Sequence, residues 1–333
     1  MADPTLTKTL DTLTVLTRDH LRPRIIDQII NTNYLTKKLL GSSEPVSGGD
    51  QIKQLLEYGD DRPIWMAEWD KVEYRVKEFA TAAYFTWAHL VDTIAFSEKQ
   101  IRVQNTGKEA ILKLLDVGSK NLAKTFRRGM QDMMFKNSAA ASTEPFNLYD
   151  IIVNYSASLA GIDPSDSKYD WWQSRYLSLS GKTYAQWINP TDDYYMEKVI
   201  GAMYDELCSD NEHPDLIVTT KKTWRTYENL LRTQNRYQGK NHVNGSFSLL
   251  DFDQAEMVAD SSCPSGHIYF LNTKYLQFVH HKDFNFTVGP FKEVTTGQEA
   301  FASKISWYGA LTVSNRAYQG VIVSAPENPV TIT

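Results

Sequence analysis

The longest regular pattern of apolar and polar residues in this 333-residue chain runs from Thr106 to Lys136. Thr106 and Glu109 have the spacing of a capping box, in which a hydroxyl and a carboxylate bind the first free backbone amides of a helix. Apolar residues then recur at steps of three, four and seven, along one helical stripe: Ile111, Leu115, Leu122, Phe126, Met130 and Met133. The pattern predicts a helix of roughly 45 Å. On its own it fits an ordinary core helix as well as a rod that supports a flatter layer.

Upstream of this helix the chain has the period of β-strands. Residues 51–58 predict a short strand, and the β-rich run after Lys71 is about 25 residues long. Because ordinary strands have about 5 to 6 residues, we expect a two-stranded ribbon that projects from the body, with its return strand entering the core. Trp65, Trp69 and Tyr74 lie in this part of the chain and are predicted to contact another subunit. The alternative, that these aromatic side chains pack on their own core, stays open.

The N-terminal segment predicts an arm and a helix. Residues 1–21 lack a clean period and are expected to be extended or partly ordered. Residues 22–40 have isoleucines and leucines at helical spacing, and Gly41 is expected to end that helix. The Gly-, Ser- and Pro-rich stretch up to residue 50 predicts a loop.

The second half of the chain mixes helices with short strands. A helix is expected after the sequence PTDD at residues 190–193, with Thr191 or Asp192 as its cap. Residues 216–219 predict a buried strand followed by another helix, and residues 303–325 predict two strands joined at 314–320. Helix, strand and helix in succession predict an α+β fold with a separate α/β subdomain.

Composition narrows the class of protein. Hydrophobic residues make up 42% and charged residues 23% of the chain, as in soluble globular proteins. The net charge of −5 and the lack of a basic patch argue against a sequence-specific reader of nucleic acid. Cys208 and Cys263 form no disulfide framework, which favours a reducing compartment. The sequence has neither a secretory signal nor an 18-residue apolar run, so we expect no membrane association and synthesis in a cytoplasm.

The histidines and cysteines show no catalytic or metal-binding pattern. No HExxH motif or zinc spacing occurs, and surface or supporting roles are expected for all seven histidines: His20, His89, His213, His242, His267, His280 and His281. His280 and His281 are neighbours in a predicted strand, so their side chains point to opposite faces. Nothing near Cys208 or Cys263 marks either thiol as an activated nucleophile.

The glycines and acidic pairs also have ordinary explanations. Gly48 and Gly49 precede a strand instead of a helix, which is the wrong order for a phosphate-binding loop. The acidic pairs fall in turns or at helix starts, where Asp is favoured anyway: Asp60/Asp61, Asp163/Asp166 and Asp192/Asp193. We therefore predict no catalytic residue, no cofactor site and no metal site, and we predict that the protein is not an enzyme.

The order of the predicted elements resembles the major capsid protein of tailed bacteriophages, which has the Hong Kong-97-type shell fold. Three segments carry the resemblance in sequence. Gly161, Ile162 and Asp163 precede the pair Trp171 and Trp172, although Pro164 stands where the family usually has Arg. HPDLIVTTKKTWRTYENLL, residues 213–231, is similar to a stretch of the family's axial domain, and NRAYQG, residues 315–320, is similar to its junction between two final strands.

The resemblance implies a division of the chain into the parts of this fold. The long helix would be the spine helix that supports a flat shell tile, and the ribbon would be the extended loop that reaches over a neighbouring subunit. The implied parts are an N-terminal arm with a short helix (1–50), an extended loop (51–86), a peripheral domain (87–165 and 275–333) with the spine helix (106–136), and an axial domain (166–274).

The resemblance also implies a function. The family has no active site, and its subunits assemble into hexamers and pentamers of an icosahedral shell around double-stranded DNA. The implied partners are other copies of the chain, a portal protein and non-specifically bound DNA, in a virion assembled in the bacterial host cytoplasm. Because only about 50 residues precede the ribbon, we expect no large fused scaffold, and either a separate scaffolding protein or none. A decoration protein stays open, as does an encapsulin-like shell that packages a cargo enzyme.

Overall fold

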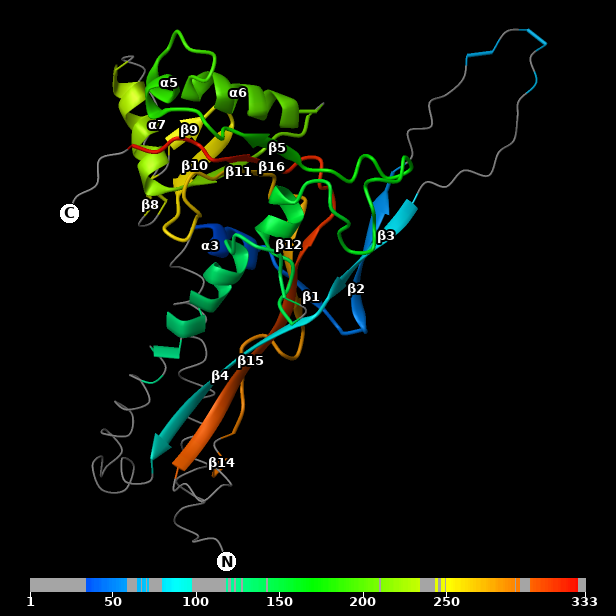
Figure 1. Ribbon diagram of the computed structural model, residues 1–333. Coiled ribbons are helices and arrows are strands. Elements are labelled where there is room, and N and C mark those ends of the chain that lie inside the picture. Colours follow the sequence, from blue (N-terminus) through cyan, green and yellow to red (C-terminus); the bar gives the residue numbers. More distant parts are fainter. Residues whose placement is uncertain are drawn as a thin grey trace, which may run out of the picture.

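The computed structural model describes residues 34–58, 65–66, 68–69, 71, 80–97, 118, 121–122, 124–126, 128–141, 143–209, 211–233, 243–244, 247–248, 250–290, 292–293 and 300–328. Figure 1 shows a compact lobe of sheet and helices from which a long two-stranded ribbon, β4 with β15, extends downward. A second ribbon, β2 with β3, leads away to the other side (Figure 1). The molecule is therefore elongated, with one globular end.

The first sheet is built around one long strand, β15. The order of its main path is β1-β12-β15-β13, and β4 and β14 also pair with β15. The strands are β1 (Glu44–Val46), β4 (Ala88–Ser97), β12 (Leu276–His281), β13 (Thr287–Val288), β14 (Lys292–Glu293) and β15 (Ala300–Val313). β4 and β15 are antiparallel along ten residue pairs, from Ala88 opposite Gly309 to Ser97 opposite Ala300. This pairing makes the long downward ribbon.

The second sheet lies in the compact lobe, in the order β5-β16-β11-β6-β10-β9. Its strands are β5 (Arg175–Ser178), β6 (Leu216–Thr219), β9 (Leu250–Phe252), β10 (Ala255–Ala259), β11 (Ile268–Leu271) and β16 (Gly320–Val323). The helices of this lobe are α5 (Tyr184–Ile188), α6 (Met196–Leu207) and α7 (Lys221–Thr233). A two-stranded hairpin, β7 (Val243–Asn244) with β8 (Phe247–Ser248), lies apart from both sheets in its pairing.

The second sheet separates two hydrophobic clusters. Ile217 of β6 belongs to the cluster that contains the buried faces of α6 and α7. Its neighbours Leu216 and Val218 belong to the other cluster, which extends into the first sheet. Since successive side chains of a strand point to opposite faces, β6 is buried on both sides, and all four of its residues are buried. The three apolar residues of this strand follow from that position, and the hydroxyl of buried Thr219 donates to the carbonyl of His267 at 3.1 Å.

The long helix packs on β4. The described residues between 118 and 134 are helical, and four of them are buried at steps of four: Leu122, Phe126, Met130 and Met134. A Cβ atom at Gly118 would lie 3.1 Å from Cζ of Phe96, and one at Gly129 would lie 3.6 Å from Cδ1 of Leu90. The two glycines therefore let the helix approach the strand closely. The apolar stripe faces the chain's own sheet, as predicted, although residues 106–117 lie outside the described part.

Two sequence-based details of helices need correction. Met134 is fully buried and Met133 is only partly so, because the buried stripe follows steps of four to the end of the helix. α6 begins at Met196 with Tyr195 as its cap residue, not with Thr191 or Asp192. The Asp192 carboxylate instead accepts a hydrogen bond from the backbone amide of Tyr194 at 2.9 Å, so it closes a turn ahead of the helix.

The predicted loop before residue 50 is partly wrong, because its residues Glu44–Val46 form β1, which pairs parallel with β12. Other predicted elements agree with the structure. β2 (Gln51–Glu57) pairs antiparallel with β3 (Ala80–Thr86) in the predicted ribbon. α3 (Tyr34–Gly41) is the end of the predicted N-terminal helix. The short apolar stretch after the long helix forms a π-helical turn, η3 (Tyr149–Val153).

The predicted strands of residues 303–325 separate into the two sheets. β15 belongs to the first sheet, whereas β16 pairs with β5 and β11 of the second. The chain therefore crosses between the sheets at residues 314–319. The predicted domain limits stay a prediction. The strand order shows, however, that residues 320–323, which were predicted to belong to the peripheral domain, share a sheet with strands of the predicted axial domain, residues 166–274.

Candidate assembly surfaces

The described residues between β2 and β3 carry two almost fully exposed tryptophans. The side chain of Trp65 is 98% exposed and that of Trp69 is 97% exposed, while Met66 is 44% exposed. We call residues 65, 66, 68, 69 and 71 the ribbon tip. Covering an indole ring removes about 200 Å² from water, worth roughly 5 kcal/mol before the costs of association. The tip therefore has a strong physical reason to be covered by something outside its own chain.

The structure describes two of the three predicted contact residues. Trp65 and Trp69 do not pack on the core of their own chain, which removes the alternative considered for them. Tyr74 lies outside the described residues. A contact of these side chains with another subunit stays a prediction.

An aromatic clasp holds the base of the β2–β3 ribbon. Tyr58, the residue after β2, stacks on Trp171 with ring centroids 5.5 Å apart and planes 15° apart. Its ring also meets the edge of Tyr169 at 5.7 Å. On β3, the backbone amide of Tyr84 donates a hydrogen bond to the carbonyl of Ala160 at 2.9 Å. Both strands of the ribbon are thus attached to the segment 160–171.

That segment has a tight local structure. Leu159 and Ile162 exchange two backbone hydrogen bonds of 3.0 Å, and Gly161 between them has φ of +84°. This left-handed conformation suits glycine because it has no Cβ. Trp172 is fully buried, and its indole N–H donates to the carbonyl of Leu159 at 3.3 Å. The GID and Trp-Trp motif of the sequence therefore builds the mount of the ribbon.

Arg316 holds the crossover between the two sheets. Its side chain is fully buried and donates hydrogen bonds to five backbone carbonyls, those of Asp150, Ile151, Asn154, Ala157 and Trp172. Burial lowers the pKa of this guanidinium to about 10, while the nearby Asp150 carboxylate acts in the opposite direction. The five N–H donors of arginine are all used here to bind backbone carbonyls of η3 and the loops beside it.

Gln319 attaches the same crossover to the residue that follows β11 of the second sheet. Its side-chain oxygen accepts from the amide of Asn272 at 3.0 Å, and its side-chain nitrogen donates to the carbonyl of Asn272 at 3.0 Å. Both residues are buried. The motif NRAYQG thus contributes two buried polar side chains that fix how β15 leaves one sheet and β16 enters the other. Sequence reasoning singled out this motif but assigned no role to Arg316 or Gln319.

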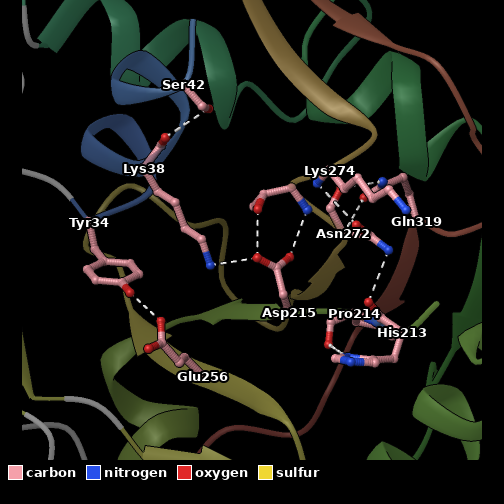
Figure 2. A network of polar contacts seen from close by, with 11 residues as sticks. Tyr34, Lys38, Ser42, His213, Pro214, Asp215, Glu256, Asn272, Lys274 and Gln319 are labelled. Atoms are coloured by element: carbon pink, nitrogen blue, oxygen red, sulfur yellow. Dashed lines mark hydrogen bonds and ion pairs between the residues drawn. The ribbon is translucent and has the colours of Figure 1, made fainter. Parts of the chain in front are cut away.

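A polar network attaches α3 to the second sheet (Figure 2). The Tyr34 hydroxyl donates to the Glu256 carboxylate on β10. Lys38 forms an ion pair of 2.6 Å with Asp215, just before β6. The same carboxylate accepts from the backbone amide of Thr273 at 2.7 Å and from its hydroxyl at 2.6 Å. The N-terminal helix is therefore held at two points.

Among the residues that the structure describes, the titratable groups show no arrangement typical of a catalytic centre. Burial raises the pKa of the Cys208 and Cys263 thiols, with neighbouring acids adding to it, so neither is an activated nucleophile. Among the described residues, no group of three metal-binding side chains comes together. Asp163 and Asp166 accept hydrogen bonds from backbone amides two residues further on, as turn residues do. Asp60, Asp61, His20 and His242 lie outside the described residues.

The described part of the chain also contains no helix long and apolar enough to span a membrane. A cleft of 690 Å³ lies between the base of the ribbon, the end of α6 and the crossover. Its charged pair, Arg175 with Glu206 at 3.4 Å, is largely exposed to solvent. This cleft therefore offers no buried acid or base.

This arrangement of elements also occurs in proteins of known structure. No protein-family model matches the sequence, and no curated protein matches it significantly. Solved structures match along most of the chain. The capsid of a native GTA particle has a TM-score of 0.59 at 11% identity, covering 86% of this chain and 89% of that one. The SrpI encapsulin of Synechococcus elongatus PCC 7942 has a TM-score of 0.58 at 9% identity and 91% coverage of both chains.

A phage structure matches equally well. The capsid of cyanophage A-1(L) has a TM-score of 0.57 at 14% identity, covering 85% of this chain and 90% of that one. The chain has the Hong Kong-97-type shell fold. The assignment of the described helical residues between 118 and 134 to a spine helix, and of β2 with β3 to an extended loop, stays a prediction. The fold occurs in viral and encapsulin shells alike, and these scores do not separate them.

Proposed function

We propose that this protein is the major capsid protein of a tailed phage. Copies of the chain assemble into hexamers and pentamers of an icosahedral shell that encloses the double-stranded DNA genome. The observation that carries the proposal is the ribbon tip, whose Trp65 and Trp69 are exposed to 98% and 97% in the single chain. Such side chains can be exposed in the isolated subunit of a shell, because a neighbouring copy covers them after assembly.

The architecture supports this role physically. The ribbon mount at residues 160–172 and the crossover at Arg316 hold projecting elements on a rigid body, so neighbouring subunits meet in a repeatable geometry. A shell needs many modest contacts of this kind, whose free energies add when copies close on one another. The net charge of −5 suits a shell that should bind its packaged DNA only weakly.

The proposal includes partners and a location. Besides other copies of itself, the chain would meet a portal protein at one vertex and packaged DNA through non-specific contacts. Assembly would use a separate scaffolding protein or none, with a decoration protein as an open addition. The protein would be part of the virion capsid and would assemble in the cytoplasm of the bacterial host.

The second candidate is an encapsulin-like nanocompartment shell that packages a cargo enzyme. The fold supports it equally, since an encapsulin matches the chain with a TM-score of 0.58. The three segments that resemble tailed-phage capsid proteins favour the phage. The neighbouring genes separate the two candidates: terminase, portal and protease genes indicate a phage, whereas a peroxidase or ferritin-like gene indicates a compartment.

The decisive experiment is negative-stain microscopy of the purified full chain over a range of protein concentration and ionic strength. We expect capsomers, tubes or closed shells. A monodisperse monomer or dimer under every condition would contradict both shell functions. Expression together with the neighbouring genes then tests the phage role, because DNA-filled particles are expected only for a phage capsid.

A further inference from the structure

A cavity of 540 Å³ lies between the C-terminal end of the long helix, the start of β4 and the loop that follows the helix. It is separate from the cleft at the base of the β2–β3 ribbon, with which it shares no lining residue. Spaces of about 300 to 1,000 Å³ with mostly apolar walls and a few polar groups are typical of small-molecule sites. We call this space the helix-end cavity.

The inner wall of the helix-end cavity is apolar. Trp307 of β15 and Ala88 of β4 line it and are only 1% and 5% exposed. Leu90 and Met133 also line it, and both are partly buried against the larger hydrophobic cluster. Gly129 leaves room on the helix side because it has no side chain. Apolar surface of a bound molecule would therefore be removed from water along this wall.

The indole N–H of Trp307 is a buried donor that has no hydrogen-bond partner among the described residues. A Cβ atom at Gly309 would lie 2.4 Å from Cζ2 of Trp307, and Gly309 is paired across the ribbon with Ala88. Cζ2 and Nε1 are bonded to the same carbon of an indole ring, so the N–H lies on the edge of the ring that faces Ala88. Since Ala88 lines the cavity, the unpaired donor is directed to that side.

The other neighbours of this ring offer no acceptor oxygen. The rings of Phe278 and Phe286 lie with their centroids 6.1 and 6.4 Å from that of Trp307. Buried donors without an acceptor are rare because they are costly. A single water molecule would pair with the indole poorly, since ordered buried waters make two to four hydrogen bonds and the wall beside Trp307 is apolar. An acceptor atom on a larger apolar molecule fits the site better.

Charges gather at the mouth of the cavity, where they are already balanced. Lys136 and Glu144 form an ion pair of 2.5 Å, and their side chains are 36% and 41% exposed. The Ala141 amide and Lys136 donate to the Glu144 carboxylate and lower its pKa, so this partner of Lys136 stays ionised. Asp132 adds a further negative charge to the lining. The mouth therefore does not favour an anionic ligand.

We propose that the helix-end cavity binds an uncharged, largely apolar small molecule, whose single acceptor oxygen receives the hydrogen bond of the Trp307 indole. Ketones, esters and ethers with an aromatic or aliphatic body have this chemistry. The inference goes beyond the proposed shell function and does not depend on it. A molecule in this place touches the helix, β4, β15 and the loop at 143–145 together, so it stabilises their arrangement.

The test compares three probes of one shape. 2-Acetylnaphthalene has an apolar body and one carbonyl oxygen, 2-isopropenylnaphthalene replaces that oxygen with a methylene group, and 2-naphthoate carries a negative charge. Equilibrium dialysis against the full chain gives each dissociation constant. We expect the ketone to bind about threefold or more tightly than the alkene, although the alkene is the more hydrophobic of the two. The anion should bind more weakly than the ketone.

The indole itself supplies a direct readout. The chain is labelled with ¹⁵N in its tryptophan side chains and kept unassembled, and the Trp307 signal is identified by its absence in Trp307→Phe. Saturating 2-acetylnaphthalene should move this N–H resonance downfield and slow its exchange with solvent. The alkene should cause neither change. An unchanged Trp307 signal at saturation would overturn the inference.

Two variants test the place of binding. A Cβ atom at Gly129 would lie 3.6 Å from Leu90, an ordinary contact, so Gly129→Leu can extend its side chain into the cavity and should weaken ketone binding about tenfold or more. Met133→Phe fills the cavity from a second position in case Gly129→Leu folds poorly. Gly41→Leu is the matched control, because its Cβ would meet nothing within 4 Å, and it should bind the ketone as the wild type does.

Trp307→Phe tests the hydrogen bond separately from the shape of the cavity. Both neutral probes change affinity when the cavity changes, but only the preference for the ketone depends on the indole N–H. The ratio of the two dissociation constants should therefore fall to about one in this variant. A preference that survives in Trp307→Phe would place the acceptor contact elsewhere and overturn the inference.

The remaining outcomes are decisive as well. Ketone binding that persists in Gly129→Leu and Met133→Phe would show that the probe lies on another apolar surface, such as the exposed tryptophans of the ribbon tip. If assembled shells bind the ketone at least tenfold more weakly than the free subunit, a neighbouring copy fills the cavity and the inference is wrong. Shells without ketone binding leave the proposed function standing. Ketone binding by a chain that never assembles supports this inference and contradicts that function.

Discussion

Lys38 of α3 and Asp215 ahead of β6 form an ion pair of 2.6 Å, and the Asp215 carboxylate also receives both polar hydrogens of Thr273. The two residues are expected to contribute unequally to the stability of this attachment. About 30% of each side chain is exposed, so the ion pair itself contributes little. The hydrogen bonds from Thr273, in contrast, involve a backbone amide that would lose its partner.

We therefore predict unequal effects of the two truncations. Lys38→Ala should lower the free energy of unfolding of the unassembled subunit by about 0.5 kcal/mol. Asp215→Ala should lower it by about 2 kcal/mol. Urea unfolding followed by circular dichroism measures both. High salt should remove most of the effect of Lys38→Ala but only the small ion-pair part of the effect of Asp215→Ala. Equal losses would show that the ion pair, not the bonds from Thr273, holds this site.

Arg316 should be the most sensitive charged residue of the described chain. Arg316→Ala removes five hydrogen bonds to buried and partly buried backbone carbonyls and should cost about 3 to 5 kcal/mol of unfolding free energy, enough to reduce soluble yield. Arg316→Lys should recover only part of this loss, because an ammonium cannot reproduce the planar fork. Arg175→Ala is the control, since its side chain is 49% exposed, and it should change stability by less than about 1 kcal/mol.

We predict that acid weakens the attachment of the C-terminal segment, because Glu327 holds this segment through hydrogen bonds to its carboxylate. Burial acts to raise the pKa of this carboxyl, but hydrogen bonds from the Gly266 amide at 3.1 Å and the Thr220 hydroxyl at 2.8 Å outweigh it, and the net pKa is lowered. A carboxyl whose pKa is lower in the folded chain stabilises the fold above its unfolded pKa of about 4.3. That contribution is lost as the pH falls through the folded pKa.

The measurement is the difference in melting temperature between the wild type and Glu327→Gln at several pH values. The wild type should be more stable at pH 7, and the difference should shrink below about pH 4. A constant difference across this range would mean that Glu327 acts through packing alone.

Gly309 is predicted to tolerate no side chain. A Cβ atom there would lie 2.4 Å from Cζ2 of Trp307 and 2.7 Å from the carbonyl oxygen of Val279, so both the ring and the β12 backbone would have to move. Gly309→Ala should cost about 2 kcal/mol or more in thermal unfolding. Gly41→Ala is the matched control, because its Cβ would meet nothing within 4 Å, and a change within about 0.5 kcal/mol is expected.

The ribbon tip should be needed for assembly but not for folding. Replacing Trp65 and Trp69 with Ser should leave the circular dichroism spectrum and melting temperature of the isolated subunit unchanged, since both rings are almost fully exposed. Shell formation, followed by light scattering and microscopy, should be impaired. Unfolding of the double variant would show that these residues belong to a core.

Much of the fold is predictable from local pattern. The strand at 216–219, the helix after it and the apolar stripe through Leu122, Phe126 and Met130 follow from periodicity, because burial selects one face of each element. The start of α6 was misplaced because Asp192 prefers a turn of its own, and a propensity for caps does not tell which of two nearby polar residues is used.

The candidate surfaces were only partly predictable. The exposed tryptophans of the tip were expected from their position in a ribbon. The contacts of Arg316 and the stacking of His89 on Tyr308 were not, since they join distant parts of the chain. Arg316 binds carbonyls more than 140 residues away, and His89 stacks on Tyr308 only because β4 and β15 pair in one register.

The sequence by itself determined the α+β class, the longer helices and several strands, the resemblance to a shell protein and the lack of a catalytic motif. Those properties depend on residues within a few positions of one another. The tertiary structure decided which sheet the last strand joins, what Arg316 binds and that His89 stacks on Tyr308. Those properties depend on strand register and on long-range pairing, and a sequence pattern specifies the face of a strand but not its neighbour.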